Sequence, residues 1–253
     1  MAISMKKISE RLHIIEDIKD CDLASLCCEA LINSSSVLIK GLIDKEYCML
    51  ARRYLSKVGR SSMPEYHPLN EYAPNHYRVN FDDERANVKG WFHQFNIFLH
   101  NQDLLNTNYY FQDIFKLKDD ISTKLGSDAI IYNSKNPSEE FISRIGFQFY
   151  PQGRGYLEEH QDFAGNNQKV VPTLIMSKKG EDFKTGGFFI EGSEVDIEDF
   201  ADIGDILIFD PQLRHGVETI DQECKYSIKS QWDFMGRWMA FATTTLKTKR
   251  RKN

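Results

Sequence analysis

The sequence has no long hydrophobic run and no paired cysteine motif. None of its apolar stretches approaches the roughly 20 residues that span a bilayer, and no apolar segment follows the lysines near the N-terminus, so we expect neither a membrane span nor a signal peptide. The five cysteines show no CxxC spacing, which argues against a zinc finger or a disulfide framework. We therefore expect free thiols and a cytoplasmic location.

The sequence also lacks an excess of positive charge. Its 32 lysines and arginines stand against 37 aspartates and glutamates, a net charge of −5 that makes a nucleic-acid partner a poor expectation. The basic segment 247–253 (KTKRRKN) is interpreted as a solvated end of the chain. A hydrophobic fraction of 41% excludes a disordered chain and is enough for one core, so we expect a single domain over residues 1–253.

Residues 1–140 are predicted to be mainly helical. Apolar residues recur at helical spacing over 16–33, 45–57 and 87–125, whereas the β-branched run 36–43 predicts a short strand. Asp44 is the expected N-cap of the second helix and Gly59 its expected end. Residues 60–80 combine prolines with polar aromatic residues, a composition typical of an irregular loop that lines a pocket.

Residues 141–246 have a different texture, in which short apolar runs alternate with Gly, Pro, Asn and Asp. This pattern predicts seven or eight strands of a β barrel or sandwich. The runs are ISRIGFQFY, KVVPTLIMS, GGFFIEG, GDILIFD, GVETI, KYSIKSQW and RWMAFATTT.

Two histidines and one aspartate lie where they could share a metal ion. In YLEEHQDF, His160 and Asp162 are two residues apart, so on an extended segment both side chains point to the same side. His215 follows the apolar strand 206–209 and could add a third ligand if the strands fold back on each other. Two imidazoles and one carboxylate leave half of an octahedron open, which is the ligand set of non-haem Fe(II) oxygenases.

A bare HxD is common by chance, so its neighbours matter. Gly186-Gly187 lies between the two ligand segments, and Lys225 follows His215 by ten residues in the predicted strand KYSIKSQW. A cation inside a barrel needs an anionic partner. A dicarboxylate cosubstrate would supply one.

With these motifs in place, Ser143–Trp232 resembles the catalytic core of the iron- and 2-oxoglutarate-dependent dioxygenases, and especially the prolyl-hydroxylase type. The resemblance is carried by FYPQGRGYLEEHQD, GDILIFDPQLRHGV and KYSIKSQW. It implies an α+β fold, with a double-stranded β-helix (jelly-roll or cupin-like) barrel core at 141–246 and supporting N-terminal helices.

The resemblance also implies roles for single residues. His160, Asp162 and His215 match the iron ligands, Lys225 matches the residue that binds the distal carboxylate of 2-oxoglutarate, and Ser227 and Tyr150 match groups that assist it. An ordinary core tyrosine and strand serine are equally good interpretations of the last two. The implied cofactors are Fe(II), 2-oxoglutarate and O2, with ascorbate as a supporting reductant.

The implied reaction is hydroxylation of an unactivated C–H bond, with succinate and CO2 as coproducts. Asp162 favours hydroxylation over halogenation, because halogenating relatives lack this carboxylate; desaturation, epoxidation and ring formation stay open. The expected substrate is a small molecule, such as an amino acid or a natural-product intermediate, and its candidate contacts are Gln148, Arg144 and Trp232. One alternative is an oxygenase that modifies a protein side chain or a nucleic acid, and another is a non-catalytic metal-binding barrel.

Overall fold

The computed structural model describes residues 4–16, 21–33, 36–127, 137–138, 140–162 and 169–248. The last five residues of the basic segment 247–253 lie outside this part. The helices are α1 (Leu23–Asn33), α2 (Lys45–Ser61), α3 (Thr107–Lys124), α4 (Ile228–Trp232) and a short 3-10 helix η1 (Ile197–Asp199). The strands are β1 (Ser4–Ser9), β2 (Leu12–Glu16), β3 (Ser36–Ile39), β4 (His76–Phe81), β5 (Gly90–Phe98), β6 (Phe141–Pro151), β7 (Tyr156–His160), β8 (Thr173–Ile175), β9 (Gly187–Ile190), β10 (Ile206–Phe209), β11 (His215–Glu218) and β12 (Gly236–Leu246). Within the described ranges, none of the helices has the length and apolarity that crossing a bilayer requires.

The strands form one large sheet in the order β1-β2-β3-β10-β8-β12-β6-β5-β7-β11-β9, and β4 pairs with β5. At its centre, β6 and β12 pair antiparallel along their whole length. Because β5 pairs with both β6 and β7, it joins the run β6-β12-β8-β10 to the run β7-β11-β9. The expectation of a β core with supporting helices is confirmed, although the sheet is not closed.

Alternation along the strands decides which side chains are buried. On β6, Ile145, Phe147 and Phe149 face the main hydrophobic core, whereas Gln148 and Tyr150 face the opposite side. This is the two-residue period of an extended chain. Trp238 on β12 continues the apolar face. One face of the sheet therefore packs in the hydrophobic core, and the opposite face carries polar side chains such as Gln148 and Tyr150.

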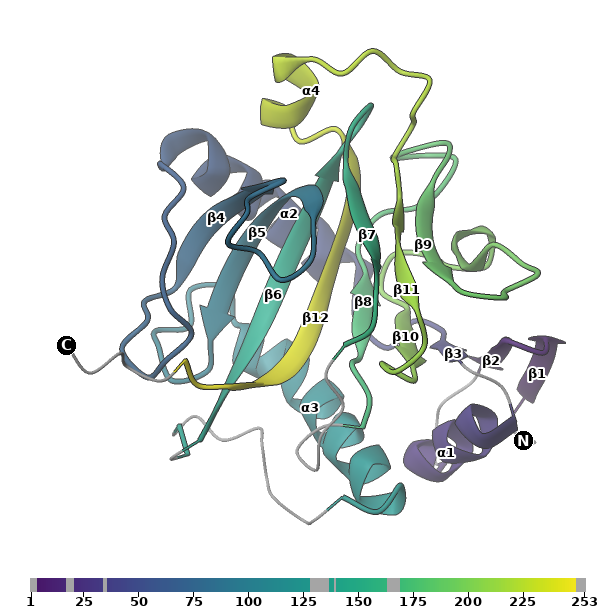
Figure 1. Ribbon diagram of the computed structural model, residues 1–253. Coiled ribbons are helices and arrows are strands. Elements are labelled where there is room, and N and C mark those ends of the chain that lie inside the picture. The colour runs from purple at the N-terminus through teal and green to yellow at the C-terminus, as the bar shows by residue number, and fades with distance from the viewer. Residues whose placement is uncertain are drawn as a thin grey trace.

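The helices cover the apolar face. In Figure 1, α2 and α3 lie behind the strands β4, β5, β6 and β12, and the buried residues Leu55 on α2 and Phe111 and Phe115 on α3 belong to the same core cluster as Trp238. Asp44 caps α2 as predicted, because its side chain accepts a hydrogen bond from the backbone N–H of Glu46.

Three predictions of local structure are wrong. Residues 1–140 contain the strands β1 to β5 as well as α1, α2 and α3, and residues 90–98 form a strand rather than a helix. The helix α2 continues past Gly59 to Ser61. The segment KYSIKSQW is no strand, because its first three residues are irregular and the rest form α4.

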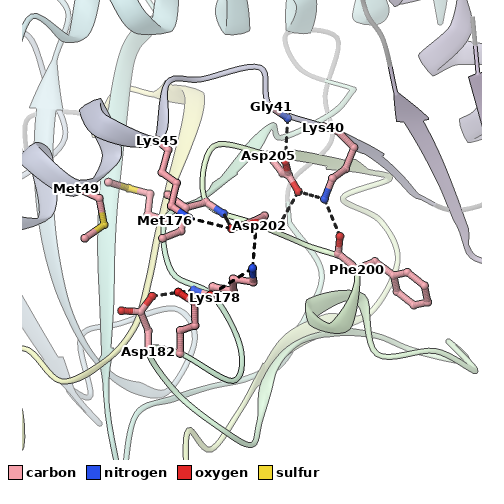
Figure 2. Close-up of polar contacts among 12 residues, drawn as sticks. Lys40, Gly41, Lys45, Met49, Met176, Lys178, Asp182, Phe200, Asp202 and Asp205 are labelled. Atoms are coloured by element: carbon pink, nitrogen blue, oxygen red, sulfur yellow. Dashed lines mark hydrogen bonds and ion pairs between the residues drawn. The ribbon is translucent and has the colours of Figure 1, made fainter.

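Ion pairs fix the start of α2 to loops of the β core (Figure 2). Asp205 is buried; it accepts a hydrogen bond from the backbone N–H of Gly41 and pairs with Lys40. Asp202 in the same loop lies 3.6 Å from the Nζ of Lys45 and 3.1 Å from that of Lys178. These contacts fix the position of β10 relative to α2. The turn after β10, which leads to His215, is positioned with it.

Candidate metal centre and cavity

His160, Asp162 and His215 lie together at the ends of two paired strands. The strands β7 and β11 are antiparallel neighbours in which His160 and His215 occupy the same register position. Their rings are 4.4 Å apart between centroids. One ligand atom from each of the three residues lies within 4.8 Å of the others. Among the described residues, this is the one group of at least three His, Cys, Asp or Glu side chains that could hold a metal ion. The predicted cluster is therefore present.

Backbone contacts aim both imidazoles the same way. The Nδ1 atom of His160 lies 2.9 Å from the carbonyl oxygen of Glu158, and the Nδ1 atom of His215 lies 2.8 Å from that of Leu213. An Nδ1–H that donates to a carbonyl fixes the neutral tautomer and leaves Nε2 as the free donor atom for a metal. The two Nε2 atoms lie 3.6 and 3.5 Å from the carboxylate oxygens of Asp162.

Asp162 is held in place by its backbone and kept ionised by the histidines. Its N–H donates to the carbonyl of Pro211 (2.8 Å), in the turn between β10 and β11. Burial opposes ionisation of this carboxyl, but the two imidazoles outweigh burial and lower its pKa. For His160, burial favours the neutral ring, whereas Asp162 raises its pKa overall. A divalent cation would replace the protons in this cluster and bind three ready ligands.

The cluster opens into a cavity of about 620 Å³ between the two runs of strands. The strands β6 and β12 supply one wall, including Arg144, Gln148 and Tyr150, and the strands β7 and β11 supply the metal-ligand side. A second cavity of about 580 Å³ adjoins it and shares Arg144, Gln148 and Asp162. The loop predicted from residues 60–80 lines this second cavity through Pro64 to His67 and Leu69.

Arg237 is a buried cation that the sequence prediction missed. It lies on β12 directly opposite Tyr150 on β6, on the face that bears the cavity-lining residues Met239 and Phe241. Its Nε donates to Glu198 (2.6 Å), and both side chains are nearly inaccessible to solvent. Its atoms Nη1 and Nη2 are buried and have no hydrogen-bond partner in the part of the chain that the structure describes. Such orphaned donors are costly unless a ligand satisfies them.

The structure does not bring Lys225, Ser227 and Trp232 to this cavity. Lys225 is exposed in the loop before α4, because the predicted strand does not form. Ser227 is the N-cap of α4, where its side chain accepts a hydrogen bond from the N–H of Ser230. Trp232 packs against the main core and meets the ring of His93 edge-on at 5.5 Å. The cation that is buried lies instead on the next strand, β12, and is Arg237.

Three other predicted residues do line the cavity. The Tyr150 hydroxyl donates to the side-chain oxygen of Gln148 (2.7 Å), and burial raises the pKa of Tyr150, so its proton stays in place. Arg144 reaches the same space with its Nη1 bonded to the side chain of Asn96 (2.7 Å). Both Arg144 and Tyr150 lie within electrostatic reach of Asp162.

Further polar residues of the site come from strands that the sequence prediction assigned to a helix or a loop. Gln94 and Asn96 on β5 are buried and hydrogen-bonded to each other (2.7 Å), and both face the second cavity. Arg78 on β4 donates to Gln94 (2.9 Å). The signal was available in the sequence, since polar Gln94 and Asn96 alternate with Phe95 and Ile97 at a two-residue period.

These elements define an α+β protein with a His-Asp-His cluster, able to hold a metal ion, at one end of a sheet-lined cavity, and its fold is that of the prolyl hydroxylases. The structure of a Pseudomonas putida prolyl-4-hydroxylase is similar over 90% of this chain and 100% of that one, with a TM-score of 0.55 and 13% identity. A Trichoplax adhaerens prolyl hydroxylase, in complex with a hypoxia inducible factor peptide fragment, is similar over 87% of both chains, with a TM-score of 0.52 and 11% identity. No protein-family model and no curated protein matches this sequence. The resemblance drawn from the motifs is confirmed for the fold.

Proposed function

We propose that this chain is an Fe(II)- and 2-oxoglutarate-dependent oxygenase that hydroxylates a small molecule. The observation that carries the proposal is the convergence of His160, Asp162 and His215 at one cavity. A guanidinium, that of Arg237, is buried opposite the cavity-lining residue Tyr150, and its Nη1 and Nη2 have no hydrogen-bond partner among the described residues. Two imidazoles and a carboxylate on one face suit ferrous iron and leave room for further ligands. In this reading the two runs of strands are the two sheets of a double-stranded β-helix.

Arg237 replaces Lys225 in the proposed cosubstrate site. A guanidinium with two free N–H groups on one edge fits a carboxylate in a bidentate manner. Glu198 fixes the other edge through Nε, so the fork is oriented before any ligand arrives. The hydroxyl of Tyr150 lies on the same wall and is able to contact the bound dicarboxylate.

Iron bound by the triad would supply the activation of O2, and the protein residues would supply position and exclusion of water. The Nδ1 contacts of His160 and His215 hold the two ligand rings, and Phe188 and Phe209 pack against the ring of His215. A small substrate is supported by the size of the cavity, which lies within the range of about 300–1,000 Å³ that is typical of small-ligand sites.

Turnover without substrate tests this proposal. Purified protein with Fe(II), ascorbate and 2-oxoglutarate should form succinate slowly, and His160→Ala should abolish that activity. Arg154→Ala is the control, because this arginine stacks on Trp91 (3.6 Å) and is absent from the lining of both cavities. The proposal is wrong if the wild-type protein forms no succinate and shows no iron-dependent binding of 2-oxoglutarate.

A further inference from the structure

Two arginines face the second cavity and form no ion pair with a carboxylate of the described residues. Arg78 on β4 and Arg144 on β6 flank the strand β5, and both line that cavity. Their hydrogen bonds within the described part of the chain go to neutral groups: Arg78 to Gln94, and Arg144 to Asn96 and Thr245. The hydrogen-bond partners of these two positive charges are thus amides and a hydroxyl, and the guanidinium of Arg144 also lies 5.1 Å from the ring centroid of Phe241.

The surroundings make these charges costly. Burial lowers the pKa of Arg144, and the charge of Arg78 lowers it further. Burial also lowers the pKa of Arg78, and its Nε atom is buried without a partner. Arginine nevertheless stays protonated in proteins. Two partly buried like charges persist in a fold only where something offsets their repulsion and lost hydration. Asp83 acts electrostatically on Arg78, and Asp162, the carboxylate that acts on Arg144, is one of the residues proposed to bind the metal.

The amides between the arginines hold them in fixed orientations. Gln94 accepts from Arg78 and donates to Asn96, and Asn96 accepts from Arg144. Gln148 extends this chain, since it donates to Gln94 at 3.4 Å. A wall of this kind is preorganised for an external anion, because its donors are oriented before the anion binds.

This pair is distinct from the cosubstrate anchor. Tyr150, which pairs with Arg237, and Arg144 lie six residues apart on the same strand and the same face, a separation of roughly 20 Å at 3.3 Å per residue. Asp162 acts electrostatically on both Tyr150 and Arg144. Arg144 thus lies near one end of β6, and Arg237 is buried opposite the other end.

We propose that Arg78 and Arg144 together bind an anionic group of the substrate, a carboxylate or a phosphate. This inference rests on the proposed oxygenase function and names the class of its substrate: a small molecule with a negatively charged end, held by the two arginines so that its other end reaches the metal centre. A neutral analogue of the same shape would leave both guanidiniums unpaired and bind weakly.

Calorimetric titration of matched ligand pairs tests this inference. The protein is loaded with Mn(II) and N-oxalylglycine, an unreactive analogue of 2-oxoglutarate, so that Arg237 is already occupied. It is then titrated with free and N-acetylated amino acids and their α-amides, and with sugar phosphates and the parent sugars. At least one anion should bind, with its neutral counterpart at least ten-fold weaker. Arg78→Gln and Arg144→Gln should each raise the dissociation constant of that anion at least ten-fold, and Arg154→Gln should leave it unchanged.

The outcomes separate the two proposals and the two anion sources. Binding of the acids assigns a carboxylate, and binding of the sugar phosphates alone assigns a phosphate. Equal binding of charged and neutral partners, unchanged binding in both variants, or no binding by any ligand of the panel would overturn the inference. Succinate formation by the wild-type protein without substrate remains the test of the oxygenase itself, so an active enzyme with no anion preference refutes this inference alone.

Discussion

One hydrogen bond orients each of three side chains at the site, those of His160, His215 and Arg237. The Nδ1 atoms of His160 and His215 are bound to backbone carbonyls two residues upstream, so a short local contact presents each Nε2 to the metal site. Arg237 is fixed through Nε and keeps its remaining edge free. In each imidazole and in the guanidinium, one nitrogen positions the side chain through a hydrogen bond. In the proposed site, the remaining nitrogen atoms bind the ligand.

Replacement of Arg237 should remove cosubstrate binding while metal binding remains. In Arg237→Gln the fork that faces the dicarboxylate is lost, so the dissociation constant for 2-oxoglutarate should rise by about 100-fold, the loss of roughly 3 kcal/mol for a charge-assisted pair. Calorimetry in the presence of Mn(II) measures this. Lys225→Ala, in an exposed loop, is the matched control and should bind normally. Loss of 2-oxoglutarate binding in Lys225→Ala, with Arg237→Gln unaffected, would reverse the assignment.

The sequence predicts the His-Asp-His cluster better than it predicts the position of the buried cation. His160 and Asp162 are recognisable because their relation is local: residues i and i+2 on an extended segment share a side. The position of Arg237 depends on the irregular segment and helix α4 that follow β11, which delay the next strand until Gly236. Spacing from His215 alone therefore pointed to Lys225, since nothing local marks where a strand resumes.

At the scale of elements, pairing partners override local periodicity. Trp91, Phe95, Phe98 and Leu99 match helical spacing, yet residues 90–98 form β5 because β4, β6 and β7 offer it hydrogen-bonding partners on both sides. Helix α2 was predicted from its own sequence because its cap and amphipathic face are local features. Strands of the β core with strongly apolar runs, such as β10, were found for the same reason.

Any side chain at Gly236, the first residue of β12, should destabilise the fold. Its φ of +139° favours glycine, and a Cβ atom there would lie 2.2 Å from the backbone carbonyl oxygen of Tyr150. Gly236→Ala should lower the free energy of unfolding by about 3 kcal/mol, since both strain and a backbone clash arise. Gly126→Ala is the control: its φ is +85°, but no heavy atom lies within 4 Å, so about 1–2 kcal/mol is expected. Urea unfolding measures both, and equal losses would contradict the role of the Tyr150 contact.

At the scale of the whole molecule, one continuous sheet separates two environments. The face covered by α2 and α3 is filled with aromatic and aliphatic side chains, whereas the other face carries the polar network, Arg78, Arg144 and the His-Asp-His cluster. The proposed site thus rests on paired strands rather than on loops, as a preorganised site requires. A substitution in the packed face should act first on stability, and a substitution in the cavity face should act first on binding.

His93 should make the stability of the whole molecule sensitive to acid. It points into the packed face, fully buried among Phe149, Trp232 and Phe234, with Nδ1 against the hydroxyl of Tyr77 (2.7 Å). Burial lowers its pKa from 6.5 to about 3. Between these two values the unfolded chain takes up a proton that the folded chain refuses, so stability falls as the pH drops below 6.5.

At pH 5 the loss from this one group should be about 2 kcal/mol relative to pH 7. His93→Phe removes the titrating group while keeping an aromatic ring in the pocket. Its free energy of unfolding should therefore depend less on pH than that of the wild-type protein, even though Tyr77 loses its hydrogen-bond partner. Urea titrations at pH 7, 6 and 5 give the comparison. Parallel curves for the two proteins would mean that His93 takes up its proton without unfolding.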